Sequence, residues 1–399
     1  MSANQSRGPW LTVLLCLGVA VLEGFDIQVL GVAMPRLAPE LGLQPLHKGW
    51  VFAFSNIGLV IGASIGGWLA DRLGRKPVFT GAVLSFAVFT LLTALVQTPV
   101  QLCLVRLLAG LGFGAAMPNM MAVAAEISAP GRRAFTTAAM FCGMPLGGGI
   151  SALLTQLLPA GFDWRTLFLI GGTMPLLLVP LLHYFLPETL PAATPQAVRA
   201  PRPPLREVLF GHGRAVPSVL LWFIFLPTLV ALYLILNWLP TLVEAKGFSK
   251  AIAPQASIAF NFASVIGALV IGWVVDRFGG RWVLSFAYAC VILGLFQLGA
   301  ATELGAVLWL SAAVGFFLMG ANYSLYGVAT AYYPTTIRGT GSGVAVGVGR
   351  VGSVLGPLVP GLLLQGGMSA TDVIVLMAPT TAVAGLAVFL LGYFPPAKD

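Results

Sequence analysis

Two carboxylic acids stand in the middle of the first long apolar run of this sequence. Glu23 and Asp26 are three residues apart, which puts both side chains on one face of a helix. They follow Trp10, where the run begins, by 13 and 16 residues, so a membrane-spanning helix would carry them near the bilayer centre. Ionised carboxylates are disfavoured in hydrocarbon, and two that share a site favour a proton on one of them. We expect at least one to take up and release a proton; the alternative is a buried acid satisfied by a neighbouring helix.

Arg350 is a cation at a similar depth in a later apolar run. It lies twelve residues past Arg338 (350 − 338 = 12), too deep for its side chain to reach water easily. A permanent charge at this depth needs an anionic partner. That partner is either a substrate carboxylate, which the planar guanidinium binds with two hydrogen bonds, or Glu23 or Asp26 between binding events. A static structural ion pair is the alternative.

Arg106 is a second arginine inside an apolar run, near its outer end. Gly110 and Gly114 continue its face at i+4 and i+8, which favours close packing against another helix. Such packing would keep Arg106 inside a helix bundle and favours a role in binding, although an arginine near a helix end can also reach the membrane surface.

Amide and aromatic side chains in other apolar runs are candidates for a binding pocket. Amides and phenols in hydrocarbon need partners, and a ring-bearing ligand with a hydroxyl group would supply both stacking and hydrogen bonds. The alternative is hydrogen bonding between helices or, for one tryptophan, a place in the outer aromatic belt. The candidates are Asn237, Trp238, Asn261, Asn322, Tyr323 and Tyr326.

A charged segment occurs twice in the chain. Residues 67–75 read GWLADRLGR and residues 272–281 read GWVVDRFGGR, an offset of 272 − 67 = 205, so one half of the chain repeats the other. An aspartate there can cap or pair with a neighbouring helix end, and the basic residues anchor the turn at the membrane face. We expect two charge latches, Asp71 with Arg75 and Asp276 with Arg281, that open with an inner gate. The gating set is Asp71, Arg72, Arg75, Asp276, Arg277 and Arg281, and a plain positively charged turn is the alternative.

A Gly- and Pro-rich stretch in the predicted fifth span completes the candidates. Gly143, Pro145 and Gly147 let helices approach closely and bend during a conformational change. Simple packing is the alternative.

The elements that position these residues follow from composition. Of 399 residues 58% are hydrophobic and only 9% are charged, which excludes a soluble globular protein and a disordered chain. Runs of about 20 apolar residues predict an all-α polytopic membrane protein with twelve spans. The spans are expected near residues 10–34, 49–70, 77–96, 102–123, 135–158, 164–185, 217–243, 252–275, 282–301, 304–327, 339–364 and 372–393.

The charge distribution predicts the topology. Net charge is +8, but the basic residues lie in short loops, which indicates membrane orientation and not nucleic-acid binding. Fourteen of the 21 Lys and Arg residues fall on one side and five on the other, which places both termini in the cytoplasm. The Pro- and Arg-rich segment 187–216 is expected to be a cytoplasmic linker between six-helix halves, residues 1–186 and 217–399.

Other function classes lack their signatures. Cys16, Cys103, Cys142 and Cys290 lie inside apolar runs without metal-ligand spacing, and we expect them to be reduced and buried. The sequence contains no nucleotide phosphate loop and no zinc-protease motif. We expect no catalytic residues, no metal and no cofactor, with energy taken from a proton gradient.

Several short stretches together resemble the aromatic acid:proton symporter family of the major facilitator superfamily, and most of all its 3-(3-hydroxyphenyl)propionate transporters. They are residues 22–28, 141–147, 237–240, 333–341 and 349–353, beside the repeated charged segment. The resemblance implies that Glu23, Asp26, Arg106 and Arg350 are essential to coupled uptake. Glu23 replaces a commoner Asp, as in the phenylpropionate branch, which points to an acid longer than benzoate.

The expected function is a proton symporter that imports a hydroxylated aromatic carboxylate as its two halves rock around a central site. Protonation of Asp26 or Glu23 would free Arg350 to bind the carboxylate, and the carrier would act as a monomer in the bacterial inner membrane. A proton antiporter that exports aromatic compounds is the first alternative, against which the mid-membrane Arg350 argues. A transporter-derived sensor is the second, and an enzyme is the least favoured.

Overall fold

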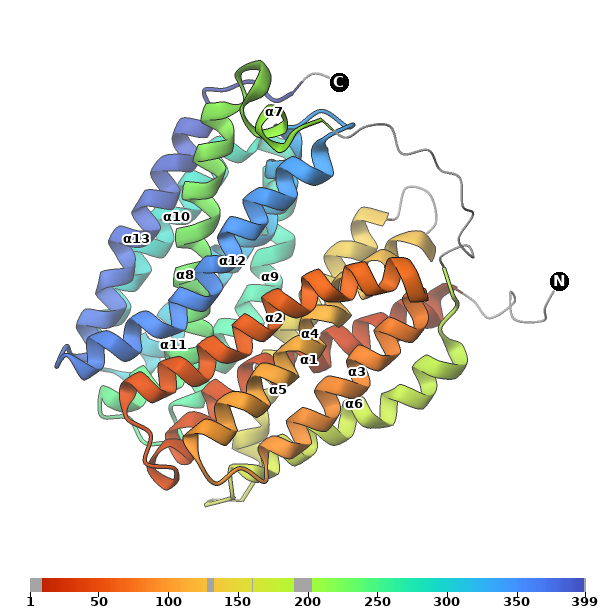
Figure 1. The fold of residues 1–399 in the computed structure, drawn as a ribbon. Coiled ribbons are helices and arrows are strands. Elements are labelled where there is room, and N and C mark those ends of the chain that lie inside the picture. The colour runs from red at the N-terminus through yellow and green to blue at the C-terminus, as the bar shows by residue number, and fades with distance from the viewer. Residues whose placement is uncertain (1–8, 128–132, 160, 190–202, 398–399) are drawn as a thin grey trace. The chain divides into compact units, whose positions relative to one another are not determined.

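The computed structural model describes residues 9–127, 133–159, 161–189 and 203–397. In these residues the chain forms thirteen α-helices and one 3-10 helix, shown in Figure 1. The helices of the first half are α1 (Pro9–Glu40), α2 (Pro45–Leu73), α3 (Arg75–Thr93), α4 (Pro99–Ile127), α5 (Arg133–Leu157) and α6 (Arg165–Phe185). Those of the second half are α7 (Leu205–Phe210), η1 (Gly211–Gly213), α8 (Ala215–Ala245), α9 (Pro254–Phe278), α10 (Gly280–Ala300), α11 (Leu304–Ala331), α12 (Arg338–Gln365) and α13 (Ala370–Leu391).

Twelve of the helices in the described residues, all except α7, are long and apolar enough to cross a membrane. A bilayer offers backbone groups no water, so an apolar segment satisfies its own amides and carbonyls by forming a helix. The predicted all-α fold with twelve spans is confirmed. The ends differ in detail: α1 continues to Glu40, six residues past the expected end at Met34, and includes Pro35 and Pro39.

The segment predicted as a linker contains regular structure. Its part from residue 205 forms α7 and η1, and Val208 and Leu209 of α7 are buried. The hydroxyl of Ser218 on α8 donates a hydrogen bond to Leu209 O at 2.7 Å. This part of the segment is therefore attached to the second half of the chain. Residues 190–202 of the predicted linker lie outside the described residues.

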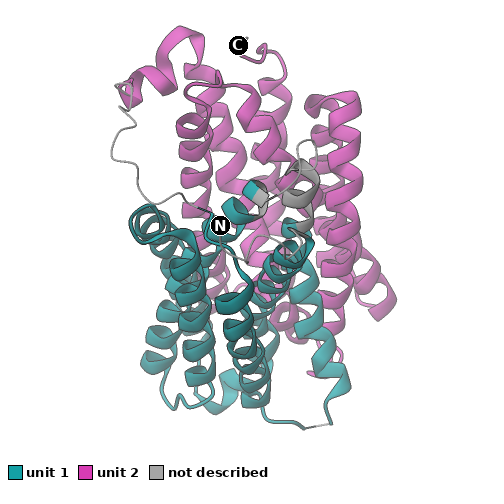
Figure 2. Ribbon diagram, turned by 90° about the vertical axis from the view of Figure 1, so that its right-hand side faces the viewer, with its two compact units in different colours: residues 1–197 teal, residues 198–399 magenta. Residues whose placement is uncertain are grey.

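The chain divides into two compact units, residues 1–197 and 198–399, coloured in Figure 2. In unit 1, α2 packs along α4, α1 along α5, and α3 against α4 and α6. In unit 2, α9 packs along α11, α8 along α12, and α10 against α11 and α13. The same pairs recur if α8 to α13 are matched with α1 to α6, so the second unit repeats the packing of the first.

Glycines place the helices of each unit at matching close contacts. Gly62 of α2 lies against the backbone of Leu111 on α4, and Gly267 of α9 lies against the backbone of Phe316 on α11. Both pairs differ by the offset of the sequence repeat, since 267 − 62 = 205 and 316 − 111 = 205. A Cβ at either glycine would collide with the facing backbone, so only Gly permits this approach.

The contact of the first and fifth helices is also repeated. Gly147 of α5 faces Val21 O on α1, and Gly352 of α12 faces Leu226 O on α8. Here too 352 − 147 = 205 and 226 − 21 = 205. The repeat detected in one charged segment thus extends to the helix contacts that hold each unit together.

Candidate functional site

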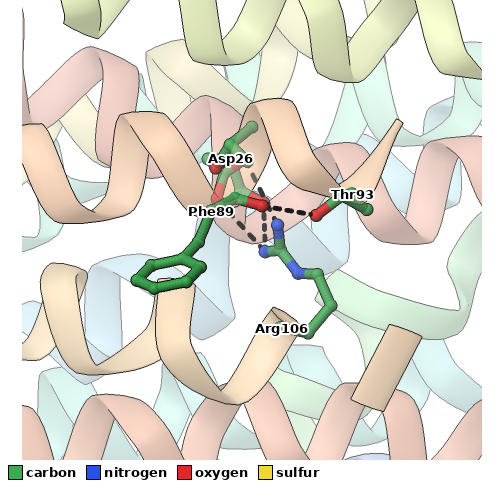
Figure 3. A network of polar contacts seen from close by, with 5 residues as sticks. Asp26, Phe89, Thr93 and Arg106 are labelled. Carbon is green, nitrogen blue, oxygen red and sulfur yellow. Dashed lines mark hydrogen bonds and ion pairs between the residues drawn. The ribbon is translucent and has the colours of Figure 1, made fainter. Parts of the chain in front are cut away.

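A buried ion pair joins α1 to α4 in unit 1, drawn in Figure 3. Arg106 Nη2 lies 3.1 Å from Asp26 Oδ2, and Arg106 Nη1 donates to Asp26 Oδ1 at 3.4 Å. The same Nη2 also donates to the backbone oxygen of Asp26 at 3.1 Å. Both side chains are 0% exposed. Two of the four charged side chains predicted to be essential are therefore brought together within one half of the chain.

The third helix contributes a hydroxyl donor to this pair. Thr90 Oγ1 on α3 donates to Asp26 Oδ1 at 2.8 Å, so the carboxylate accepts hydrogen bonds from two helices. Beside it, Thr93 Oγ1 donates to Phe89 O at 2.9 Å and stays within its own helix (Figure 3). Sequence reasoning missed Thr90, because a threonine in an apolar run is common. The available signal was a buried hydroxyl that needs a partner.

Aromatic rings surround the Arg106 guanidinium. Its Cζ lies 5.7 Å from the ring centre of Phe113 and 5.9 Å from that of Phe168, and both rings are fully buried. A cation is attracted to the face of an aromatic ring, most strongly where water is excluded. The rings therefore add to the stabilisation of a charge that Asp26 already compensates.

Close packing of α1 holds the two acids in place. Gly24, between them in sequence, faces the backbone of Met144 on α5, and Gly171 of α6 faces the ring of Phe25. Glu23 is fully buried, like Asp26. The predicted glycines of α5 act at this contact, since Gly143 lies against Ala20. The neighbouring Pro145 is buried inside the same helix.

In unit 2, Arg350 on α12 contacts a tyrosine on α8. Its Nη1 donates to the hydroxyl oxygen of Tyr233 at 3.2 Å, and Tyr233 is 6% exposed. The preceding Gly349 allows α12 to lie close to α8, because a Cβ there would meet the Cβ of Phe225 at 2.9 Å. Tyr233 was not among the predicted residues; the signal that could have found it was a phenol in an apolar run, four residues before Asn237.

The predicted pocket residues divide by their hydrogen bonds. The amides of Asn237 and Asn261 donate to the carbonyl oxygens of Tyr233 and Ser257, at 2.6 and 2.9 Å, each four residues earlier in the same helix. Trp238 is fully buried and donates to Pro357 O on α12 at 2.9 Å, which is a bond between helices.

The remaining three lie on α11. Tyr326 packs edge-on against Phe225, with ring centres 5.5 Å apart. Asn322, one turn before Tyr326, is 3% exposed, and Tyr323 is half-buried. Their roles in ligand binding stay predictions.

The predicted latch residues have other neighbours. Arg75 Nη2 lies 2.8 Å from Glu126 Oε1 on α4, while Asp71 is exposed and forms no ion pair with a described residue. Arg72 lies over the Trp68 ring at 4.0 Å. The Asp71–Arg75 latch therefore stays a prediction, with Glu126 as the partner of Arg75 in this structure.

Glu188, beyond α6, caps the start of α3. Its Oε1 and Oε2 accept hydrogen bonds from the backbone nitrogens of Arg75 and Lys76, at 3.0 and 3.2 Å. A carboxylate at a helix N-terminus satisfies free amides and complements the helix dipole. The turn of unit 1 is thus held by two acids, Glu126 and Glu188, that the sequence did not single out.

In the corresponding turn of unit 2 the arginines pack against aromatic side chains. Arg281 Cζ lies 3.7 Å from the Tyr393 ring centre and 4.5 Å from that of Phe389. Arg277 lies 5.8 Å from the Trp273 ring, and Asp276 is exposed. Among the described residues Asp276 and Arg281 form no ion pair, so this latch also stays a prediction.

The four cysteines are free thiols. Cys16 and Cys142 are buried, but Cys103 and Cys290 are only partly buried, so the expectation that all four are buried was wrong for these two. A lipid-facing helix surface accommodates a small apolar thiol as readily as the bundle interior does. Over the described ranges no cluster of His, Cys, Asp or Glu could hold a metal ion.

The fold and the buried charges together define a polytopic membrane transporter. The sequence matches the Major Facilitator Superfamily over residues 16–260 and 255–399, and the chain belongs to this family. The D-xylose-proton symporter has the same fold, with a TM-score of 0.80, 19% identity and coverage of 97% of this chain and 98% of that one. The inward-open xylose transporter XylE from E. coli gives a TM-score of 0.75 with 17% identity, covering 98% and 97%.

The sequence relatives are aromatic acid transporters. The 3-(3-hydroxy-phenyl)propionate transporter of Escherichia coli K12 is 37% identical and covers 98% of this chain and 95% of that protein. The gallate transporter of Pseudomonas putida is 33% identical, covering 96% and 92%. The 4-hydroxybenzoate transporter PcaK of the same organism is 33% identical, covering 97% and 93%. The predicted resemblance to this branch of the superfamily is confirmed.

Proposed function

We propose that this protein is a proton-coupled symporter that imports a hydroxylated aromatic carboxylate. The observation that carries the proposal is the fully buried Asp26–Arg106 pair with the fully buried Glu23 one turn before it on α1. Burying ionisable groups inside a membrane-spanning bundle costs free energy. Where such groups occur, they mark ion and substrate pathways. The substrates in the names of the relatives support an aromatic acid as the cargo.

Within this proposal the two acids have different tasks. Asp26 accepts side-chain hydrogen bonds from Thr90 and from both terminal nitrogens of Arg106, which is the pattern of an ionised, acceptor-only carboxylate. We assign it to positioning: it keeps Arg106 buried and fixes α1 against α3 and α4. Because Asp26 is committed to this pair, we assign the transported proton to Glu23.

Arg350 is the proposed binding group for the substrate carboxylate. The Tyr233 hydroxyl accepts a hydrogen bond from one of its terminal nitrogens and so orients the planar guanidinium. A guanidinium binds a carboxylate with two parallel hydrogen bonds, which sets its orientation as well as its affinity. Binding a proton at Glu23 and an anion at Arg350 adds no net charge to the membrane interior, which favours closure around the loaded carrier.

The remaining features of the proposal follow from topology. The excess of Lys and Arg in alternate loops supports an inner-membrane protein with both termini in the cytoplasm. One chain carries both the acids of α1 and the arginine of α12, which supports function as a monomer. A proton gradient supplies the energy, and the proposal includes no cofactor.

The test is uptake of radiolabelled 3-(3-hydroxyphenyl)propionate into proteoliposomes with an imposed inward proton gradient, with and without a protonophore. Benzoate, 4-hydroxybenzoate, gallate and cinnamate serve as competitors. We expect accumulation that the protonophore abolishes, with hydroxylated acids competing best. Folded protein that accumulates no aromatic acid would refute the proposal. Proton-driven efflux from preloaded vesicles would then favour an antiporter that exports aromatic compounds.

A further inference from the structure

The asparagines of the described helices are of two kinds. In four of them the side-chain Nδ2 donates a hydrogen bond to the carbonyl oxygen four residues earlier. These are Asn56, Asn119, Asn237 and Asn261. Asn322 on α11 makes no such bond; its side chain is 3% exposed, and its buried Oδ1 accepts a hydrogen bond from none of the residues that the structure describes.

An orphan amide oxygen in this position indicates a missing partner. A buried acceptor that has lost water and gained no donor is destabilising, and native proteins keep very few of them. The four back-bonded asparagines demonstrate that helices of this chain can satisfy an amide internally. Asn322 is therefore available to a group that comes from outside the protein.

Asn322 and Arg350 lie on two helices of unit 2, α11 and α12, that both pack against α8. Tyr326, one turn along α11, packs edge-on against Phe225 of α8. Phe225 in turn is the side chain that faces Gly349 on α12, immediately before Arg350. These contacts join α11 and α12 through α8, the helix whose Tyr233 accepts the hydrogen bond from Arg350.

We propose that Asn322 recognises the ring hydroxyl of the substrate and sets the preference for hydroxylated over unsubstituted aromatic acids. The proposal rests on the function proposed above. A carboxylate cannot satisfy Oδ1, because both are acceptors, whereas a phenol donates to it. An amide oxygen only accepts hydrogen bonds, and the phenol O–H supplies the donor that it lacks.

The consequence is a selectivity that depends on one residue. A neutral hydrogen bond made only by the hydroxylated acid corresponds to about tenfold in affinity. The unsubstituted acid binds through Arg350 alone and leaves Oδ1 unsatisfied. Removing the amide should therefore weaken the hydroxylated acid and leave the unsubstituted one almost unchanged.

The experiment compares two ligands in two variants of the full chain. The ligands are the hydroxylated 3-(3-hydroxyphenyl)propionate and the unsubstituted 3-phenylpropionate, and uptake into proteoliposomes gives the Michaelis constant for each. The proteins are wild type, Asn322→Leu and the matched control Asn56→Leu, which loses a back-bonded amide in unit 1. We expect wild type and Asn56→Leu to favour the hydroxylated acid about tenfold. In Asn322→Leu the ratio should fall to within about twofold, mainly through weaker apparent affinity for the hydroxylated acid.

The outcomes separate the two proposals. Discrimination that persists in Asn322→Leu refutes the role of Asn322 and leaves the proposed function intact. Wild type that accumulates neither acid refutes the proposed function and this inference with it. If Asn322→Leu accumulates neither acid, the rise in Tm that each ligand produces is measured in solubilised Asn322→Ala. Equal rises with the two acids support the inference. A larger rise with the hydroxylated acid, as in wild type, contradicts it.

Discussion

The two units share their helix packing but not their buried charges. Asp26 and Arg106 of unit 1 correspond by the offset of 205 to Ala231 and Ser311 of unit 2 (26 + 205 = 231; 106 + 205 = 311), and all four side chains are fully buried. Unit 2 thus forms the same pairs of packed helices with an alanine and a serine in place of the ion pair. The comparison teaches that this helix packing forms in unit 2 without the ion pair, which supports the proposal that the pair of unit 1 serves transport.

The reverse holds for Arg350. It corresponds to Pro145 of unit 1 (350 − 145 = 205). It lies on α12 near the close contact with α8 that repeats the contact of α5 with α1. In unit 1 the Arg106 guanidinium pairs with a carboxylate of the same unit, whereas in unit 2 the Arg350 guanidinium donates a hydrogen bond to the hydroxyl of Tyr233.

The largest expected effect comes from breaking the unit 1 pair on one side. Arg106→Ala leaves a buried carboxylate without its cation and should lower the free energy of unfolding by about 3–5 kcal/mol. Asp26→Ala/Arg106→Ser copies unit 2 and should recover most of that stability while uptake stays lost. Thermal and denaturant unfolding in detergent measures the first quantity, and proteoliposome uptake the second.

This prediction can fail in two informative ways. If the double variant is as unstable as Arg106→Ala, the ion pair is needed for the fold and the comparison with unit 2 misleads. If the double variant transports normally, the pair has no role in transport.

The second-largest expected effect comes from replacing Arg350 of unit 2 or its hydrogen-bond partner. Arg350→Ala should weaken the apparent affinity for the aromatic acid about 100-fold or more, because the substrate carboxylate loses its charged partner, with little loss of stability. Arg350→Lys keeps the charge but not the two-pronged geometry, and should recover only part of the affinity. Tyr233→Phe removes one hydrogen bond and should weaken the affinity by about threefold to tenfold. Substrate titrations of uptake measure all three, and accumulation at normal substrate affinity in Arg350→Ala would refute the carboxylate assignment.

The smallest effects concern the turns at the repeated charged segment. Arg75 pairs with Glu126, with 21% and 38% of the side chains exposed, so Arg75→Ala should cost about 1 kcal/mol of stability at most. Arg281→Ala removes a cation packed against rings and should have an effect of similar size. The free energy of unfolding of each variant, measured at about 0.1 and about 1 M NaCl, distinguishes the two contacts. Salt screens the exposed ion pair of Arg75, so the loss in Arg75→Ala should shrink at high salt. Equal salt dependence in both variants would contradict the difference between the turns.

The sequence predicted the fold well because the bilayer imposes a simple rule. A span must be about 20 apolar residues long and helical, and twelve such runs are visible by inspection. Buried charges were visible for the same reason, since an ionisable residue in an apolar run is rare. The segment at 205–213 was the exception: α7 is too short to produce a periodic pattern, and its burial depends on contact with α8.

The hydrogen-bond and ion-pair partners of the site residues were harder to predict than the site residues themselves. The sequence left a substrate carboxylate, Glu23 and Asp26 open as partners of Arg350, whereas the structure pairs Asp26 with Arg106, 80 residues away on α4. Nothing local indicates which distant side chain a carboxylate meets. Thr90 and Tyr233 were missed because a single hydroxyl carries no spacing signal, and Glu126 and Glu188 because an acid near a helix end has many ordinary roles.

The central claim is that Glu23 carries the proton while Asp26 only holds Arg106 in place. The most direct measurement compares two transport modes in Glu23→Gln and Asp26→Asn proteoliposomes: accumulation driven by a proton gradient, and counterflow of labelled substrate at equal pH, which needs no net proton movement. The account predicts that Glu23→Gln loses accumulation but keeps counterflow, and that Asp26→Asn loses both. Protonophore-sensitive accumulation at the wild-type level in Glu23→Gln would contradict it.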